Sequence, residues 1–175
     1  MAGRKIPKKL NETELWDYAL RVLARRAHAS RELRQKLSAR AQSPADVDVT
    51  MTKLREYGFA DDAKFSEAFA GSRLQNQGFG RLRVLHELRS KRIAPAIAAK
   101  AVEKTFDGTD ELQLIQTYLE RKYRGKDLKQ FLKEEKNLAS AYRRLRNAGF
   151  SSNGSITILK RYSRATDDWD ASSED

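Results

Sequence analysis

The sequence predicts an all-α protein made of three tandem three-helix modules of about fifty residues each, which stack into an elongated, curved body. Only three prolines and nine glycines interrupt 175 residues rich in strong helix formers. Apolar residues recur three and four positions apart, as on one face of a helix. Several landmarks also repeat at a single spacing of 51 residues, which indicates an internal repeat. These pairs are Leu33 and Val84, Leu37 and Leu88, and Pro44 and Pro95.

The first module spans residues 11–59. Each of its three helices is expected to begin with a side chain that can accept a hydrogen bond from a free backbone N–H. These caps are Asn11, Ser30 and Ser43. Glu14 follows the first cap by three residues and completes a capping-box pattern. Pro44 suits the first position of the third helix, where a missing N–H does no harm, and Gly58 is expected to end that helix.

The second module spans residues 60–107 and follows the same plan. Asp61 or Asp62 is expected to cap its first helix, since acidic residues favour the positive end of a helix. Gly78 and Gly80 are expected to break the chain before a short basic helix. Each module has too small a core to be very stable alone, so neighbouring modules should pack on each other.

The third module, residues 108–162, is the least regular copy. Thr109 is expected to cap its first helix. An insertion near residues 124–137 lengthens the following loop and is expected to add a helical turn or two. The alternation Ser-Ile-Thr-Ile at 155–158 is typical of a strand, but a lone strand would have no partner, so a helix is predicted there.

The two ends of the chain carry opposite charges. Residues 1–10 are expected to form a basic, flexible head and residues 163–175 an acidic, flexible tail. Their charges cancel, so the body between them retains the net charge of +11. A basic body needs an anionic partner, and nucleic acid, an acidic protein groove and anionic lipid all qualify. Lipid is the least favoured of these because no strongly apolar amphipathic face accompanies the charge.

Cysteine is absent from the sequence, and this agrees with a reducing compartment, so a cytoplasmic location is expected. No apolar run is long enough to span a membrane, which takes about 18 residues. The first ten residues, MAGRKIPKKL, have charges without an apolar stretch behind them. We therefore expect neither a signal peptide nor a membrane anchor.

No constellation of residues indicates an enzyme. The two histidines, His28 and His86, lie far apart and have no acidic or histidine neighbour at metal-ligand spacing. The motifs of P-loop nucleotide hydrolases, serine hydrolases and zinc proteases are all missing. We expect no metal, no cofactor and no catalytic residue, so the protein should act by binding. An enzyme with an unrecognised site is the least favoured alternative.

Basic residues are the strongest functional candidates, because they recur on the second helix of every module. A solvated helix surface would explain any one of them. Their repetition on a shared face instead favours a continuous electropositive track that meets phosphates or an acidic protein wall. The candidates are Arg25, Arg26, Arg31, Arg34, Lys36, Arg81, Arg83, Arg89, Lys91, Arg92, Arg143, Arg144 and Arg146.

Aromatic residues are sparse and lie at core-like spacing or at helix joints. We therefore interpret them as packing residues and not as platforms for stacking bases. They are Trp16, Tyr57, Phe59, Phe65, Phe69 and Phe150.

Several segments resemble the core of the bacterial RecX family. They are SRELRQKL at 30–37, YGFADD at 57–62 with Phe65, Ala68 and Phe69 after it, QGFG at 77–80, and Glu87-Leu88. The order and spacing of these pieces carry the resemblance, which covers residues 14–106 well and 110–162 loosely. The sequence departs from the family where Lys91-Arg92-Ile93 stands in place of the usual Lys-Gly-Ile, at a helix end that often uses glycine.

The resemblance implies a regulator of the RecA recombinase with no enzyme activity, and we expect the protein to be a monomer. Such a protein lodges in the groove of the RecA–single-stranded DNA filament and restrains filament growth, ATP turnover and strand exchange. Single-stranded DNA phosphates would also be contacted by the basic faces. The alternative is a general nucleic-acid-binding helical protein that acts without RecA.

Overall fold

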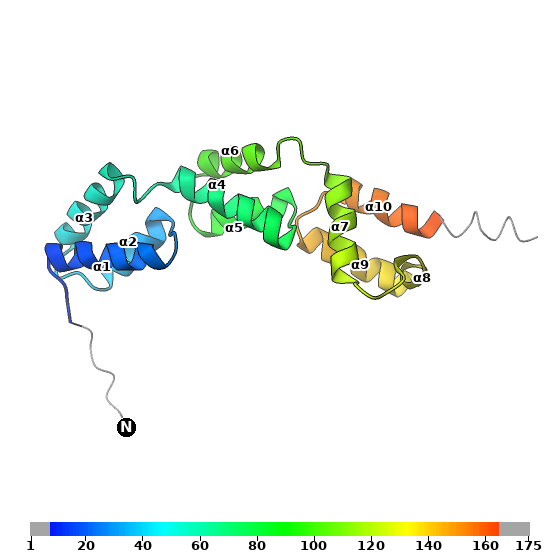
Figure 1. Cartoon of the computed structure of the whole chain (residues 1–175), viewed down its shortest axis with the longest axis horizontal. Coiled ribbons are helices and arrows are strands. Elements are labelled where there is room, and N and C mark those ends of the chain that lie inside the picture. The colour runs from blue at the N-terminus through cyan, green and yellow to red at the C-terminus, as the bar shows by residue number, and fades with distance from the viewer. Residues whose placement is uncertain (1–7, 165–175) are drawn as a thin grey trace, which may run out of the picture. The chain divides into compact units, whose positions relative to one another are not determined.

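The computed structural model describes residues 8–164, and within this range the chain is helical with no β-sheet (Figure 1). A single β-bridge in this range pairs Leu10, just before the first helix, with Ala41, which lies between the second and third helices. The predicted all-α class is therefore confirmed. The helices are α1 (Glu12–Arg25), α2 (Ser30–Ser38), α3 (Pro44–Glu56), α4 (Asp62–Ser72) with the π-helical turn η1 (Arg73–Gln77), α5 (Arg81–Ser90), α6 (Pro95–Phe106), α7 (Glu111–Lys122), α8 (Leu128–Leu132), α9 (Glu135–Asn147) and α10 (Ser152–Arg164).

The helices follow the predicted order of three modules. Helices α1–α3 lie within 11–59 and α4–α6 within 60–107, and α10 continues two residues past position 162. The described chain divides into two compact units, one with residues 8–68 and 88–98, the other with residues 69–87 and 99–164. The middle module is thus shared between the units. Most of the predicted basic head and acidic tail, residues 1–7 and 165–175, lie outside the described residues.

The core of the first unit forms where α1 packs on α2 and α3. Its fully buried side chains include Leu15, Leu33, Leu37, Met51 and Leu54. Burying one such side chain contributes about 1.5–3 kcal/mol, so these residues supply most of the force that holds the three helices together.

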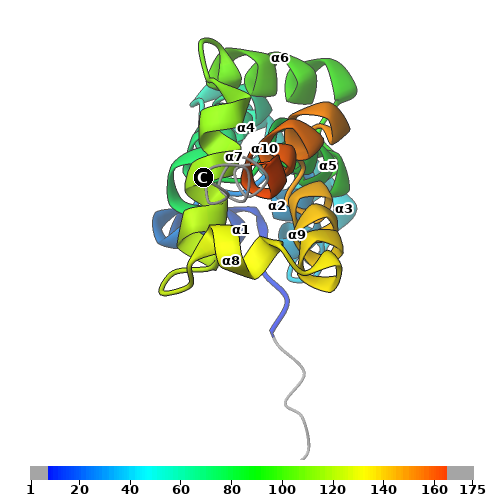
Figure 2. The ribbon, with the colours of Figure 1, turned by 90° about the vertical axis from the view of Figure 1, so that its right-hand side faces the viewer.

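The core of the second unit lies among α7, α8, α9 and α10, which lie close together in both Figure 1 and Figure 2. Phe150 is completely buried at its centre, and its ring meets the ring of Tyr118 edge-on at a centroid distance of 5.4 Å. The insertion in the third module forms the short helix α8, as predicted, and Leu132 from this helix joins the core. The segment 155–158 is helical, which confirms the choice of helix over strand.

Two of the predicted helix caps are confirmed in full. The Asn11 side chain accepts from Glu14 N at 3.0 Å, and the Glu14 carboxylate accepts from Asn11 N at 3.2 Å. Ser43 and Asp46 make the same reciprocal pair at the start of α3. Such a cap stabilises a helix by about 1 kcal/mol, so the starts of α1 and α3 are fixed locally.

The predicted Ser30 cap is wrong, and the cap comes from the next module. Ser30 is the first helical residue of α2, whose N-cap position is held by Ala29 without any side-chain bond. The Ser30 N–H donates instead to the Asp62 carboxylate, at 2.8 Å. Asp61 caps α4 by accepting from the N–H groups of residues 63 and 64. The adjacent acids Asp61 and Asp62 therefore serve two different helices.

The predicted Thr109 cap is wrong by one residue. Asp110 caps α7, and its carboxylate accepts from Leu112 N at 2.8 Å. A carboxylate also carries a negative charge that the positive start of the helix favours, whereas a threonine hydroxyl does not.

The repeat landmarks occupy equivalent structural positions. Leu33, Val84, Leu37 and Leu88 are all completely buried. Pro44 and Pro95 are the first residues of α3 and α6. Arg92, at the departure from the family pattern, has φ +63° and is the only non-glycine residue within 8–164 with positive φ. The arginine thus adopts the left-handed conformation that glycine usually provides after a helix.

Two glycines bring the start of α5 against the turn between α9 and α10. Gly80 N–H donates to Ala148 O at 2.8 Å, and Leu82 N–H donates to Gly149 O at 3.0 Å. A Cβ added at Gly149 would lie 2.2 Å from the Arg83 backbone nitrogen, and Gly149 also has φ +88°. Only glycine allows the two backbones to approach so closely.

We expect Gly149→Ala to destabilise the protein far more than Gly108→Ala. Both positions have positive φ, but nothing lies within 4 Å of a Cβ placed at Gly108. Each change costs about 1 kcal/mol for backbone strain, and Gly149→Ala should add about 1–3 kcal/mol for the overlap with Arg83. Urea unfolding followed by circular dichroism measures both. An equal loss of unfolding free energy in the two variants would contradict the close approach of Gly149 to the Arg83 backbone.

Candidate nucleic-acid interface

A basic hollow of about 560 Å³ lies between α1 and α2 in the first unit; we call it the α1–α2 hollow. Its lining residues are Tyr18, Arg21, Val22, Arg25, Arg26, His28, Lys36 and Arg40. No carboxylate is among these residues, all of which lie within 8–164. The hollow is basic because Arg21 and Arg25 are one turn apart on α1, while Lys36 in the last turn of α2 and Arg40 in the turn after this helix are also four positions apart.

The basic side chains of the α1–α2 hollow differ in their contacts with other side chains. Arg40 lies over the Tyr18 ring, with its guanidinium carbon 5.3 Å from the ring centre. Arg26 pairs with Glu32 at 2.5 Å. Within residues 8–164, no ion pair involves Arg21, Arg25 or Lys36. These three charges therefore remain available for an anionic partner.

His28 is the buried polar residue of the α1–α2 hollow. Its Nδ1 lies 3.0 Å from a Glu32 carboxylate oxygen, although the pair lacks the geometry of a hydrogen bond. Burial lowers the pKa of His28, and the positive charges of Arg26 and Lys36 lower it further, against the opposing effect of Glu32. The imidazole is therefore neutral at pH 7.

A second basic surface, the α2–α5 hollow, joins the first two modules within the first unit. It is lined by Arg31, Glu32, Gln35, Ser90, Lys91 and Arg92. The carboxylate of Glu32 is engaged by Arg26, so the three basic side chains dominate the charge of this surface. Residues about sixty positions apart in the sequence are thereby brought together.

A third basic surface, the α5–α9 hollow, lies in the second unit. It is lined by Arg83, Tyr118, Ser140, Arg143, Arg144, Asn147 and Ala148. Arg83 is fixed there, since its guanidinium donates to Asn147 O at 3.0 Å and stacks 4.3 Å from the Phe79 ring centre. Burial raises the pKa of Tyr118, while the charges of Arg144, Arg83 and Arg121 lower it. This hollow therefore combines an aromatic ring with several cations.

The other predicted basic residues do not join these hollows. Arg34 forms an ion pair with Asp48 on α3. Arg146 donates to the Phe150 carbonyl at the turn after α9 and faces a neighbouring hollow with His86. Arg89 is exposed on α5 and lines none of the hollows described above. The candidates that line the hollows thus form two patches within the first unit and one within the second.

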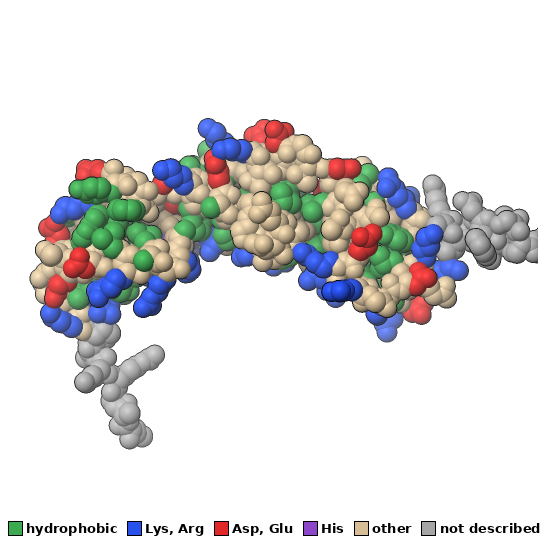
Figure 3. Space-filling view, viewed as in Figure 1, with side chains coloured by type: hydrophobic (Ala, Val, Ile, Leu, Met, Phe, Trp, Pro, Cys, Tyr) green, Lys and Arg blue, Asp and Glu red, His purple; other side chains and the backbone are tan. Residues whose placement is uncertain are grey.

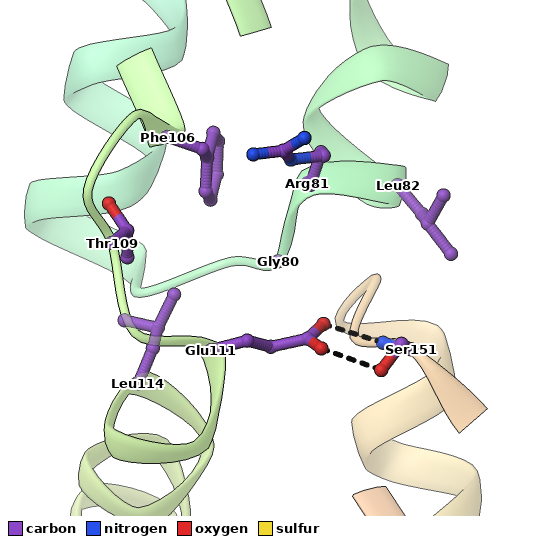
Figure 4. A pocket seen from close by; sticks show the side chains of 8 residues that line it. All are labelled: Gly80, Arg81, Leu82, Phe106, Thr109, Glu111, Leu114 and Ser151. Carbon is purple, nitrogen blue, oxygen red and sulfur yellow. Dashed lines mark hydrogen bonds between the residues drawn. The ribbon is translucent and has the colours of Figure 1, made fainter. Parts of the chain in front are cut away.

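Arg81 belongs to a different kind of site. It lines a pocket of about 340 Å³, where its guanidinium carbon lies 5.8 Å from the Phe106 ring centre (Figure 4). Across this pocket the Glu111 carboxylate accepts from Ser151 N at 2.8 Å and from Ser151 Oγ at 2.6 Å. With one arginine and one carboxylate, the pocket lacks the excess positive charge of the three hollows.

Two basic residues of the hollows are not among the candidate site residues chosen from the sequence. Arg21 and Arg40 line the α1–α2 hollow. Their sequence signal is the spacing of four residues that separates Arg21 from Arg25 and Lys36 from Arg40. Among the described residues, no group of three or more histidine, cysteine or acidic side chains could hold a metal ion. No helix in the same range is long and apolar enough to cross a membrane.

Comparison with known protein families gives two matches. The model described as "RecX, first three-helix domain" matches residues 16–54, and that described as "RecX, second three-helix domain" matches residues 61–102. The "Regulatory protein RecX" of Chromohalobacter salexigens is 32% identical over 126 residues, which cover 71% of this chain and 81% of that protein. The corresponding protein of Halorhodospira halophila is 40% identical over 87 residues, covering 50% of this chain and 53% of its own length.

Solved structures show the same fold. The crystal structure of RecX from Lactobacillus salivarius superposes with a TM-score of 0.64 at 16% identity, covering 86% of this chain and 96% of that one. A second structure, titled "Crystal structure of regulatory protein RecX", gives a TM-score of 0.65 at 17% identity and covers 85% of this chain and 71% of its own.

The lowered pKa of His28 should make stability depend on pH. In the unfolded chain its pKa is about 6.5, so below that pH the unfolded state binds a proton that the folded state resists. We expect the free energy of unfolding to fall as the pH drops from 7 to 5.5, and His28→Gln to weaken this dependence. Urea titrations at several pH values measure both. An equal fall in the free energy of unfolding of the unchanged protein and of His28→Gln would contradict the lowered pKa of His28.

Proposed function

Because the chain belongs to the RecX family of regulatory proteins, we propose that it regulates the RecA recombinase. It binds in the groove of the RecA–single-stranded DNA filament and restrains filament growth, ATP hydrolysis and strand exchange during DNA repair and recombination. It acts in the cytoplasm as a monomer, by binding and without a catalytic step or a cofactor.

The observation that carries this proposal is the set of basic hollows at the joints between helices. The α1–α2 hollow presents Arg21, Arg25 and Lys36 without an ion-pair partner among the described residues. The α5–α9 hollow presents Arg143 and Arg144 beside an aromatic ring. The paired N–H groups of an arginine guanidinium match the geometry of two phosphate oxygens, so these surfaces suit the backbone of a nucleic acid strand.

The presence of a basic hollow on each of the two units favours a filament over a short stretch of bare DNA. The first unit and the second unit each carry at least one such hollow. Two weak phosphate contacts on one chain gain affinity when both meet the same assembly, because the second contact becomes intramolecular. A filament offers phosphates and protein surface at regular intervals. Binding to bare nucleic acid without RecA is the alternative that the same hollows would support.

The effect on filament activity is the direct test. Added to RecA on single-stranded DNA, the protein should reduce ATP hydrolysis and strand exchange at ratios below one chain per RecA subunit. If both activities are unchanged while the protein still binds bare DNA, the alternative reading holds and the proposed regulation is wrong.

Neutralising the α1–α2 hollow should reduce the salt dependence of binding to single-stranded DNA. Each lost phosphate contact lowers the slope of log affinity against log salt by about 0.7, so Arg25→Gln with Lys36→Gln should lower it by about 1.4. The control is Arg55→Gln with Arg161→Gln, two exposed residues that line none of the three hollows. Fluorescence anisotropy at several salt concentrations gives the slopes. Equal reductions in both variants would show that overall charge, and not the hollow, binds DNA.

A further inference from the structure

Three aromatic rings form an exposed cluster on the first module, which we call the aromatic triad: Trp16, Tyr57 and Phe59. The ring of Trp16 lies 5.6 Å from that of Tyr57 and 6.4 Å from that of Phe59, and the last two are 6.3 Å apart. Tyr57 is 68% exposed and Phe59 is 49% exposed. The interpretation of these two residues as packing residues is therefore wrong, whereas it holds for the buried Phe65 and Phe150.

The backbone holds the triad in place. Gly58 has φ +70° and ends α3, so that the chain reverses between Tyr57 and Phe59. The N–H groups of Phe59 and Ala60 both donate to the Leu54 carbonyl, at 2.8 and 3.0 Å. Such a turn fixes the backbone that carries the two rings before any partner arrives, which lowers the entropy cost of binding.

Two ion pairs lie beside the triad, and Arg55 and Glu56, which precede Tyr57, carry opposite charges. Lys53 forms an ion pair with Glu12 at 2.5 Å, and Lys64 lies 3.8 Å from the Asp61 carboxylate. The rim of the triad is thus close to neutral, in contrast to the basic hollows. A neutral rim gives no attraction to phosphates. Aromatic anchors inside a polar rim are instead the usual centre of a protein–protein interface.

The triad and the α1–α2 hollow lie on opposite sides of α1. Nine residues separate Trp16 from Arg25, which is two and a half helical turns at about 3.6 residues per turn. Figure 3 shows hydrophobic side chains gathered over α1 and α3 on one face of the first module. One thin module therefore offers an apolar surface and a cationic surface in different directions.

We propose that the aromatic triad is the docking surface for a protein subunit of the filament, while the basic hollows take the DNA phosphates. The partner surface is an apolar depression of low net charge, large enough to receive the rings of Tyr57 and Phe59. This assignment rests on the proposed function, since it presupposes that the target contains both protein and DNA. The proposal assigns the contacts with protein to the aromatic triad and the contacts with DNA to the basic hollows.

The test uses Tyr57→Ser with Phe59→Ser in the full chain, and Val49→Ser as the matched control. Val49 lies on the same helix, α3, and is 39% exposed. Affinity is measured in parallel for the RecA–single-stranded DNA filament and for bare single-stranded DNA. The triad variant should lose filament affinity by about tenfold or more, with unchanged affinity for bare DNA. Tyr57→Phe, which keeps the ring, should bind the filament as the unchanged chain does.

The outcomes separate this inference from the proposed function. If the unchanged chain fails to act on the filament, the proposed function is wrong. If it acts and the triad variant binds the filament equally well, the docking surface is wrong. A loss of bare-DNA affinity in the variant would mean that the rings stack on bases. A chain that is dimeric by sedimentation, with a monomeric variant, would mean that the triad binds a second copy. Thermal unfolding by circular dichroism must first give the same midpoint for the variant and the control.

Discussion

The hydrogen bond from the Ser30 N–H to the Asp62 carboxylate joins the first two modules, and the arrangement of the first unit depends on it. The start of a helix has free N–H groups and a partial positive charge, so a buried start needs an acceptor. Here α2 has no cap of its own, and the second module supplies one. The bond ties the start of α2 to the start of α4, and within the same unit Arg31 lies next to Lys91 and Arg92.

The joint between the second and third modules uses close backbone contact instead of a carboxylate. Gly80 and Gly149 let the start of α5 lie against the turn after α9, where two backbone hydrogen bonds form. Arg83 is thereby placed beside Arg143 and Arg144 in the α5–α9 hollow. Both joints therefore have the same consequence. Packing one thin module on the next, which a small core requires, also assembles basic residues from distant parts of the sequence into one surface.

Local signals in the sequence predicted most of the fold. The capping box at Asn11, the cap at Ser43 and the helix end at Gly58 depend only on residues within one turn, and all three are confirmed. The 51-residue repeat also identified buried positions correctly, because equivalent residues occupy equivalent places. The start of α2 could not be predicted in this way. The hydrogen-bond acceptor at this helix start is Asp62, which is 32 residues away in the sequence. It comes near Ser30 only when the first two modules pack together.

The candidate site was less predictable, because the availability of a charge depends on tertiary pairing. Arg34 and Lys36 lie on the same short helix, yet Arg34 pairs with Asp48 on α3 whereas Lys36 faces the α1–α2 hollow. Helical spacing does not reveal such a partner. The exposure of Tyr57 was missed for a related reason. The sequence identifies aromatic residues at a helix joint, but the three-dimensional turn decides whether they enter the core.

Chemical footprinting of arginine side chains by phenylglyoxal, read by mass spectrometry, tests the central claim most directly. The reaction is carried out on the protein alone and on the protein bound to RecA on single-stranded DNA. The account predicts that the filament protects Arg25, Arg143 and Arg144, which line the hollows, and leaves Arg161 as reactive as before. Equal reactivity of Arg25, Arg143 and Arg144 with and without the filament would contradict it.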